Sequence, residues 1–334
     1  MNKCISVSLL LMASLPVTAG GYIFAGESNG VDIVTHPKGY LGIGGRINLS
    51  VCIDPTSSNS ASLVTSVENI VEAWNQLNPV EANLKLFGDN NIPSNSQYDW
   101  ESVTLHEVGH CIGLSHPNLG SQTGVSGSNT NYTYSTDGAD NTFDFDDGAD
   151  DIIGSSDDLR DDDVNLFYFN NQVNNPFVLS PPYDSTNYSR AVANLPGGDN
   201  FPANPDRSVG AALGVADTEG VMQQGTFNDE DQRRLAADDV VTIKYAMSGV
   251  DEMQGTADDY TYRLEYGGIT AGCDINIKHD PTYTGFAVCG TTGFFVSGNH
   301  LRIEEANIRV NPNAVSWFYN DVKNDLIFKN DFYY

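Results

Sequence analysis

The segment TLHEVGHCIGLSHP, residues 104–117, holds three of the six histidines in this 334-residue chain, together with one glutamate. His106 and His110 are four positions apart, so on a helix both imidazoles leave the same face about one turn apart and can bind one ion. Glu107 projects beside them without having to be a ligand. Gly113 permits a left-handed turn that ends the helix and brings His116 back toward the same ion.

Three imidazoles leave the fourth position of a tetrahedral zinc ion to water, which is the arrangement of catalytic zinc sites. Zinc lowers the pKa of this water toward neutrality, and Glu107 can take its proton. We therefore predict His106, His110 and His116 as zinc ligands and Glu107 as the general base. The alternative is a set of ordinary histidines on a helix surface, but a chance match at these spacings has a probability on the order of 10⁻⁵.

The other three histidines have no such grouping. His36, His279 and His300 are isolated in the sequence, so we predict that they are incidental to metal binding.

Residues 1–19 have the features of a secretory signal peptide. Lys3 supplies an early positive charge, residues 5–15 form a short apolar run, and residues 17–19 form a small-residue cleavage site. The apolar run is too short to span a bilayer, and no later segment is long enough. We predict a secreted, extracellular protein that begins near Gly20.

Export permits disulfides, and four cysteines remain after the signal segment. Four cysteines allow three connectivities, among which sequence cannot choose. Because Cys273 and Cys289 lie in one strand-rich stretch and would close a short loop, we predict that they pair with each other. Cys52 and Cys111 would then form the second disulfide, or remain as two buried free thiols.

The formal net charge is −28, which argues against nucleic acid as a partner because phosphates would be repelled. Aspartate is concentrated in residues 137–163, where glycines and apolar residues interrupt the charge. Residues 148–159 align without gaps on residues 249–260, and both have glycines and closely spaced aspartates suited to calcium. The candidate calcium ligands are Asp150, Asp157, Asp158, Asp251, Asp258 and Asp259. The alternative is a pair of acidic turns that bind no metal.

Hydrophobic periodicity predicts three helices, over residues 62–77, from near Trp100 through the histidine motif, and over 237–247. Alternating patterns predict strands at 46–53, 83–87 and 164–169. From residue 260 onward the pattern is typical of strands, in the segments TYRLEY, DINIKH, GFAVC, GFFVSG, LRIEEANIRV and VSWFY.

Three motifs resemble the metzincin zinc peptidases. The residues HEVGHCIGLSH at 106–116 match the metzincin zinc signature, and Pro117 after them is similar to the serralysin branch. TEGVMQQG at 218–225 resembles the methionine turn of these enzymes. RRLAADDV at 233–240 resembles the last helix of matrixin catalytic domains.

The resemblance implies an α+β catalytic domain, with a small mixed sheet and three helices, over residues 20–249. It implies that Met222 forms an apolar floor beneath the zinc, and that a protein or peptide substrate binds in extended form along an edge strand. In this chain the domain would carry a long Asp/Gly-rich insertion at 118–217 and be followed by a β-rich region at 250–334. The first two helices are too close together for the full family sheet, so the sequence does not locate the substrate strand.

Two hypotheses follow from these observations. The first is a secreted zinc-dependent endopeptidase in which zinc-activated water hydrolyses peptide bonds and Glu107 is the base. The second is an acidic, calcium-binding extracellular structural protein with a non-catalytic zinc site. In either case we expect calcium to raise thermal stability by folding the acidic insertion.

Overall fold

The computed structural model describes three ranges of the chain, residues 20–116, 169–189 and 207–318. Short gaps within them fall at 25–26, 29–30, 87–91, 94–95, 171–176, 178, 180, 213 and 224. The predictions for the signal segment, for Pro117, and for Asp150, Asp157 and Asp158 lie outside the described residues. Most of the predicted insertion, including residues 137–163, lies outside them as well.

The main sheet of the described part has six strands. Five of them lie side by side in the order β11 (Ala287–Ser297), β12 (His300–Val310), β10 (Ile275–His279), β4 (Gly45–Ile53) and β9 (Tyr260–Ile269). β3 (Val34–His36) pairs with the start of β12. All of these pairings are parallel except that of β11, which runs antiparallel to β12 and forms an edge of the sheet.

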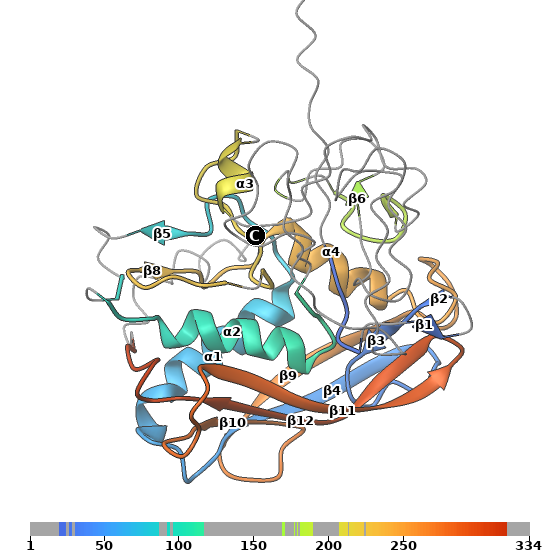
Figure 1. The fold of residues 1–334 in the computed structure, drawn as a ribbon. Helices are drawn as coiled ribbons and strands as arrows, with labels where there is room; N and C mark the ends of the chain where they lie inside the picture. The colour runs from blue at the N-terminus through green and yellow to red at the C-terminus, as the bar shows by residue number, and fades with distance from the viewer. Residues whose placement is uncertain are drawn as a thin grey trace, which may run out of the picture.

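One face of this sheet is covered by helices (Figure 1). In β9 the buried residues Tyr260, Tyr262 and Leu264 alternate with exposed ones, because successive side chains of a strand point to opposite faces. β10 alternates in the same way. The arrangement is mixed α/β, broadly α+β, with a mainly parallel sheet, which confirms this part of the predicted fold class.

Helix α1 (Val64–Gln76) packs against β9 through an apolar face that includes Val67, Ile70 and Trp74. A 3-10 turn at Ser60–Leu63 precedes it, so the predicted helix over 62–77 is confirmed. Helix α2 (Trp100–Cys111) begins at Asp99, whose side chain accepts a hydrogen bond from Ser102 N at 3.0 Å. This cap is typical of helix starts, and α2 packs on β11 and β12.

The remaining elements are two helices and three short ribbons. Helix α4 (Ala237–Ala246) agrees with the third predicted helix, and α3 (Arg207–Ala212) is a short helix before the Met222 turn. Three two-stranded ribbons complete the described part: β1 (Glu27–Ser28) with β2 (Val31–Asp32), β5 (Lys85–Leu86) with β8 (Glu230–Asp231), and β6 (Phe169–Asn170) with β7 (Tyr188–Ser189).

Four of the six strands in the sheet come from residues after α4. β9, β10, β11 and β12 pair with one another and with β4, so the strand-rich C-terminal region completes the sheet under α1 and α2. The predicted segments GFAVC and GFFVSG form the single strand β11. In the described part of the predicted strand VSWFY, Trp317 forms an isolated parallel bridge with Asp99.

The predicted disulfide pairing is wrong. Cys52 is bonded to Cys273, with Cα atoms 5.7 Å apart, and Cys111 is bonded to Cys289, with Cα atoms 5.8 Å apart. Cys273 and Cys289 are close in sequence, but β12 separates β10 from β11 in the sheet. β4 lies between β9 and β10, beside their connection, and α2 crosses β11, so each cysteine meets a partner far along the chain.

Two of the isolated histidines form a buried pair. His36 Nε2 lies 2.8 Å from His300 Nδ1, and His36 Nδ1 lies 3.2 Å from the Tyr260 hydroxyl. The Tyr40 ring packs against the His36 ring at a tilt of 34°, with centroids 4.2 Å apart, and the Glu252 carboxylate is 3.7 Å from His300 Nε2. Burial, and secondarily the neighbouring His300, hold the pKa of His36 well below its usual value.

This burial predicts an acid-sensitive fold. Below about pH 6.5 the unfolded chain protonates His36 while the folded protein does not, so the unfolded state binds more protons and stability falls as the pH falls. We expect His36 to contribute a decrease in the free energy of unfolding of metal-free protein between pH 7 and pH 5. His36→Gln should remove this contribution and change the slope by up to about 1.4 kcal/mol per pH unit. Chemical denaturation at several pH values measures both slopes, and identical slopes would contradict the prediction.

Candidate metal centre

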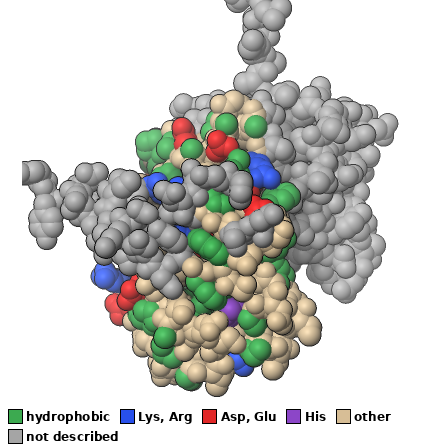
Figure 2. Space-filling model, turned by 90° about the vertical axis from the view of Figure 1, so that its left-hand side faces the viewer, with side chains coloured by type: hydrophobic (Ala, Val, Ile, Leu, Met, Phe, Trp, Pro, Cys, Tyr) green, Lys and Arg blue, Asp and Glu red, His purple; other side chains and the backbone are tan. Residues whose placement is uncertain are grey.

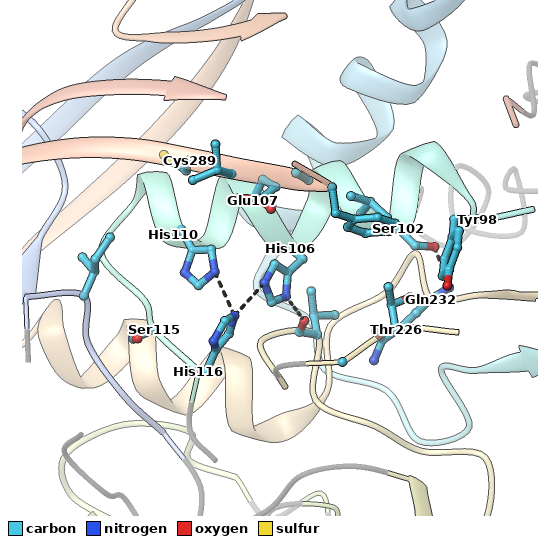
Figure 3. A pocket seen from close by; sticks show the side chains of 17 residues that line it. Tyr98, Ser102, His106, Glu107, His110, Ser115, His116, Thr226, Gln232 and Cys289 are labelled. Atoms are coloured by element: carbon cyan, nitrogen blue, oxygen red, sulfur yellow. Dashed lines mark hydrogen bonds between the residues drawn. The ribbon is translucent and has the colours of Figure 1, made fainter. Parts of the chain in front are cut away.

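The three predicted zinc ligands meet in one place. One ligand atom each of His106, His110 and His116 lies within 4.8 Å of the other two. The His116 Nε2 atom is 3.1 Å from His106 Nε2 and 3.2 Å from His110 Nε2 (Figure 3). Three ring nitrogens that converge in this way form a nitrogen donor set for a single ion.

Backbone carbonyls orient two of these imidazoles. His106 Nδ1 donates a hydrogen bond to Val221 O at 2.6 Å, and His110 Nδ1 donates one to Leu114 O at 2.8 Å. Because a carbonyl can only accept, the proton of each ring is placed on Nδ1 and the lone pair on Nε2, where the metal would bind. Outer hydrogen bonds of this kind fix the tautomer and the ring orientation of metal ligands.

Burial also holds the cluster in its neutral form. It lowers the pKa of His106 and that of His116, and it lowers the pKa of His110 to about 3. For His110 and His116 the neighbouring imidazoles add to this effect. A metal ion binds the neutral imidazole, so the pocket favours the protonation state that a ligand needs.

The turn between the second and third ligands is fixed by its neighbours. Gly113 has a φ of +122°, and a Cβ atom there would lie 2.8 Å from Thr35 O, so a side chain is excluded. This confirms the predicted role of the glycine. The segment after the predicted signal peptide pairs with the turn: Ser115 N donates to Gly21 O at 2.8 Å and Ile23 N donates to Gly113 O at 3.0 Å.

Met222 lies against α2 between the turns that carry His106 and His110. A Cβ atom on Gly109 would be 2.2 Å from Met222 Sδ and 3.0 Å from the Trp74 ring, so only glycine permits this contact. Met222 is 2% exposed. Met222 therefore lies against the ligand-bearing helix, and its role as an apolar floor beneath the zinc stays a prediction.

Asp239 holds the Met222 turn and was missed by the sequence analysis. Its carboxylate accepts hydrogen bonds from Val221 N at 3.0 Å, Met222 N at 2.9 Å and Ala236 N at 2.7 Å. Val221 O in turn accepts a hydrogen bond from His106, so Asp239 supports the position of this ligand indirectly, through the Val221 backbone. The sequence does show an acidic residue in the first turn of a predicted helix, where it is favourable. No local sequence pattern predicts that its carboxylate accepts hydrogen bonds from the Met222 turn.

Glu107 lines the same pocket as the histidines. Its Oε2 atom is buried and has no hydrogen-bond partner among the described residues. Burial raises the pKa of Glu107 to about 8. A carboxyl group with a pKa near neutrality and one uncommitted oxygen is suited to accept and return a proton.

The pocket around the cluster has a volume of about 640 Å³. β11 forms one wall through Ala287, Val288 and Cys289, and the rings of Tyr98 and Phe286, 4.9 Å apart, stand beyond Glu107. The ligand histidines are partly exposed, whereas the other three histidines are buried. Figure 2 shows a histidine side chain reaching the surface with hydrophobic side chains near it.

The described half of the predicted calcium sites forms a hydrogen-bonded turn. Asp258 Oδ2 accepts from Val250 N and Asp251 N, and Asp259 Oδ2 accepts from Gly255 N. Among the described residues, only the three ligand histidines form a group of three or more metal-binding side chains within 4.8 Å, so Asp251, Asp258 and Asp259 do not. Calcium binding by this protein stays a prediction.

The cluster fits zinc better than a hard cation such as calcium. It offers three neutral nitrogens, two of them oriented by carbonyls, with a buried and uncommitted carboxylate oxygen beside them. No family model, curated protein or solved structure matches the chain. None of the helices in the described ranges has the length and apolarity needed to cross a membrane.

Removal of one imidazole should disrupt metal binding. We expect His116→Ala to weaken zinc affinity by more than about 100-fold, because loss of even an outer-shell partner costs about 10–100-fold. His300→Gln, at a buried histidine outside the cluster, is the matched control and should retain the parent affinity. Competition with a chromophoric chelator measures both. Equal affinities in the two variants would rule out His116 as a ligand.

Loss of the Asp239 carboxylate should destabilise the protein. Asp239→Ala leaves three buried N–H groups without an acceptor, at a cost of about 1–3 kcal/mol each. Asp239→Asn keeps one carbonyl oxygen and should lose clearly less. Urea denaturation gives both free energies, and an alanine variant as stable as the asparagine variant would refute this account of the Met222 turn.

Proposed function

We propose that this protein is a secreted zinc-dependent endopeptidase. The proposal rests on one observation: three neutral imidazoles, two of them oriented by carbonyls, and a buried glutamate with an uncommitted oxygen line a single pocket beside an edge strand. Each of these parts has a role in peptide hydrolysis.

The imidazoles of His106, His110 and His116 would hold the zinc ion. When bound, zinc supplies a Lewis acid that polarises a carbonyl and makes water more acidic. Val221 O and Leu114 O keep two of the rings in the tautomer required for ligation. Met222 and Gly109 keep the two ligand-bearing turns of α2 in place.

Glu107 is the general base in this proposal. Its uncommitted oxygen takes the proton from the attacking water and then delivers it to the departing amine. The burial of Glu107 raises the pKa of its carboxyl, which favours acceptance of the proton from water.

The substrate would bind along β11. This strand has β12 on one side only, and its residues Ala287 to Cys289 line the pocket. An extended peptide can add to such an edge through backbone hydrogen bonds. The pocket beside Glu107, with Tyr98 and Phe286, offers space for a substrate side chain.

Secretion is consistent with the disulfides. Two disulfides join distant parts of the chain, and bonds of this kind form in oxidising compartments. The alternative, a structural protein with a non-catalytic zinc site, gives no role to Glu107. A structural zinc site is closed by four protein ligands, whereas the described residues supply three to this cluster, which opens into a pocket.

A single substitution tests the mechanism. Glu107→Gln should lower kcat by about 10²-fold or more, since it removes general-base catalysis, while zinc content stays at one ion per chain. Hydrolysis of a peptide library and elemental analysis give the two measurements.

The matched control lies on the same helix. Glu101 is also a buried carboxylate of α2, where Asn69 donates to it, and it does not line the pocket. Glu101→Gln should cleave peptides like the parent. A Glu107→Gln variant with parent activity would disprove the proposed mechanism, and failure of the zinc-loaded parent to cleave any peptide would favour the structural alternative.

A further inference from the structure

The backbone of residues 21–23 lies against the turn that leads to the third candidate ligand. Ser115 N donates a hydrogen bond to Gly21 O at 2.8 Å. Ile23 N donates one to Gly113 O at 3.0 Å. The segment and the turn therefore pair like two short antiparallel strands, and a displacement of the segment would displace the turn with it.

Tyr22 lies at the centre of this pairing, where it forms an antiparallel bridge with Leu114. Its side chain is 1% exposed, and its hydroxyl donates a hydrogen bond to Thr242 O at 2.8 Å. Thr242 belongs to α4. The segment is thus joined to the turn through its backbone and to α4 through the side chain of Tyr22.

A second hydroxyl group holds the same segment. Thr35 is a buried residue of β3, and its Oγ1 donates a hydrogen bond to Ile23 O. Segment 21–23 therefore has one side-chain contact with a helix and one with the sheet, in addition to its pairing with the turn.

The turn held in this way positions two of the three candidate ligands. His116 directly follows Ser115, whose N–H is bonded to the segment (Figure 3). Leu114 O accepts the hydrogen bond from His110 Nδ1 at 2.8 Å. Because Leu114 also forms the bridge with Tyr22, the carbonyl that orients His110 is set by the position of the segment.

Helix α4 also supports the remaining ligand. Its Asp239 accepts a hydrogen bond from Val221 N, and Val221 O accepts one from His106. Thr242 lies three positions after Asp239, so the two contacts leave α4 about one turn apart. The position of α4 is therefore transmitted to all three imidazoles by two separate routes, one of which passes through Tyr22.

We propose that Tyr22 is a positioning residue for the zinc ligands, whose hydroxyl fixes the turn bearing His116 relative to α4 and thereby relative to His106. This inference rests on the proposed function, from which it takes the zinc site, but it does not require peptide hydrolysis. Without the hydroxyl, segment 21–23 stays paired with the turn, while the spacing between His106 and the other two imidazoles is no longer fixed. Zinc then binds more weakly.

The test compares two tyrosine variants of the purified protein. Tyr22→Phe removes only the hydroxyl, and we expect it to weaken zinc affinity at least about tenfold, since loss of an outer-shell partner costs about 10–100-fold. Tyr40→Phe is the matched control, because Tyr40 is also 1% exposed and its hydroxyl donates to a backbone carbonyl, that of Asp258. Tyr40 does not line the pocket, so this variant should keep the parent affinity. Competition with a chromophoric chelator measures both.

Cobalt(II) in place of zinc reports the ligand geometry. The visible absorption of bound cobalt depends on the number and arrangement of its ligands. Tyr22→Phe should change this spectrum, whereas Tyr40→Phe should give the parent spectrum. A merely structural loss of stability would lower the melting temperature and leave the spectrum of the folded, cobalt-loaded protein unaltered.

Thr35→Val is an independent variant, because it removes the other hydroxyl contact of the segment and leaves Tyr22 intact. It should also weaken zinc affinity. A parent-like affinity or a parent-like cobalt spectrum in Tyr22→Phe would overturn the proposal, and so would a parent-like affinity in Thr35→Val if Tyr22→Phe does not fold. These results would leave the peptidase proposal intact. If the zinc-loaded parent cleaves no peptide but the variants differ as expected, the peptidase proposal fails and the role of Tyr22 stands.

Discussion

The close packing around Gly109 is the constraint on which the candidate site depends. Met222 and Trp74 press against α2 at the one position between the two ligand-bearing turns where no side chain projects. The helix is thereby held between the Met222 turn and the sheet, and the imidazoles of His106 and His110 line the pocket. Protein interiors are packed densely enough that even one added methyl group would displace the helix or its neighbours.

The contacts that surround the imidazoles form one connected set. Asp239 holds the Met222 turn, which places Val221 O against His106. Backbone hydrogen bonds from residues 21–23 hold the turn after α2, which places Leu114 O against His110. Two of the three ligands, His106 and His110, are therefore oriented by backbone carbonyls outside α2. Metal affinity in such a site depends on the fold as a whole as well as on the ligands.

The features of the fold and site that could be predicted from sequence are those that depend on the spacing of residues close together in the chain. The helix that bears the histidines, the turn at Gly113 and the convergence of His106, His110 and His116 all follow from periodicity and from glycine conformation. The disulfides could not be predicted, because β12 separates β10 from β11 and no local pattern reports sheet order. The pocket wall formed by β11 and the hydrogen bonds of Asp239 could not be predicted either, because they join elements that are far apart in the sequence. Both isolated histidines of the buried pair, His36 and His300, also meet through the β3–β12 pairing alone.

The chain order of the sheet has a consequence for synthesis. α2 and His116 precede β9 to β12 in the chain, so the three histidines and Glu107 leave the ribosome before the strands that pack against the helix have been made. A chain that ended before residue 287 would carry these side chains without β11, which lines their pocket. The pocket is therefore complete only after β11 and β12 have been synthesised.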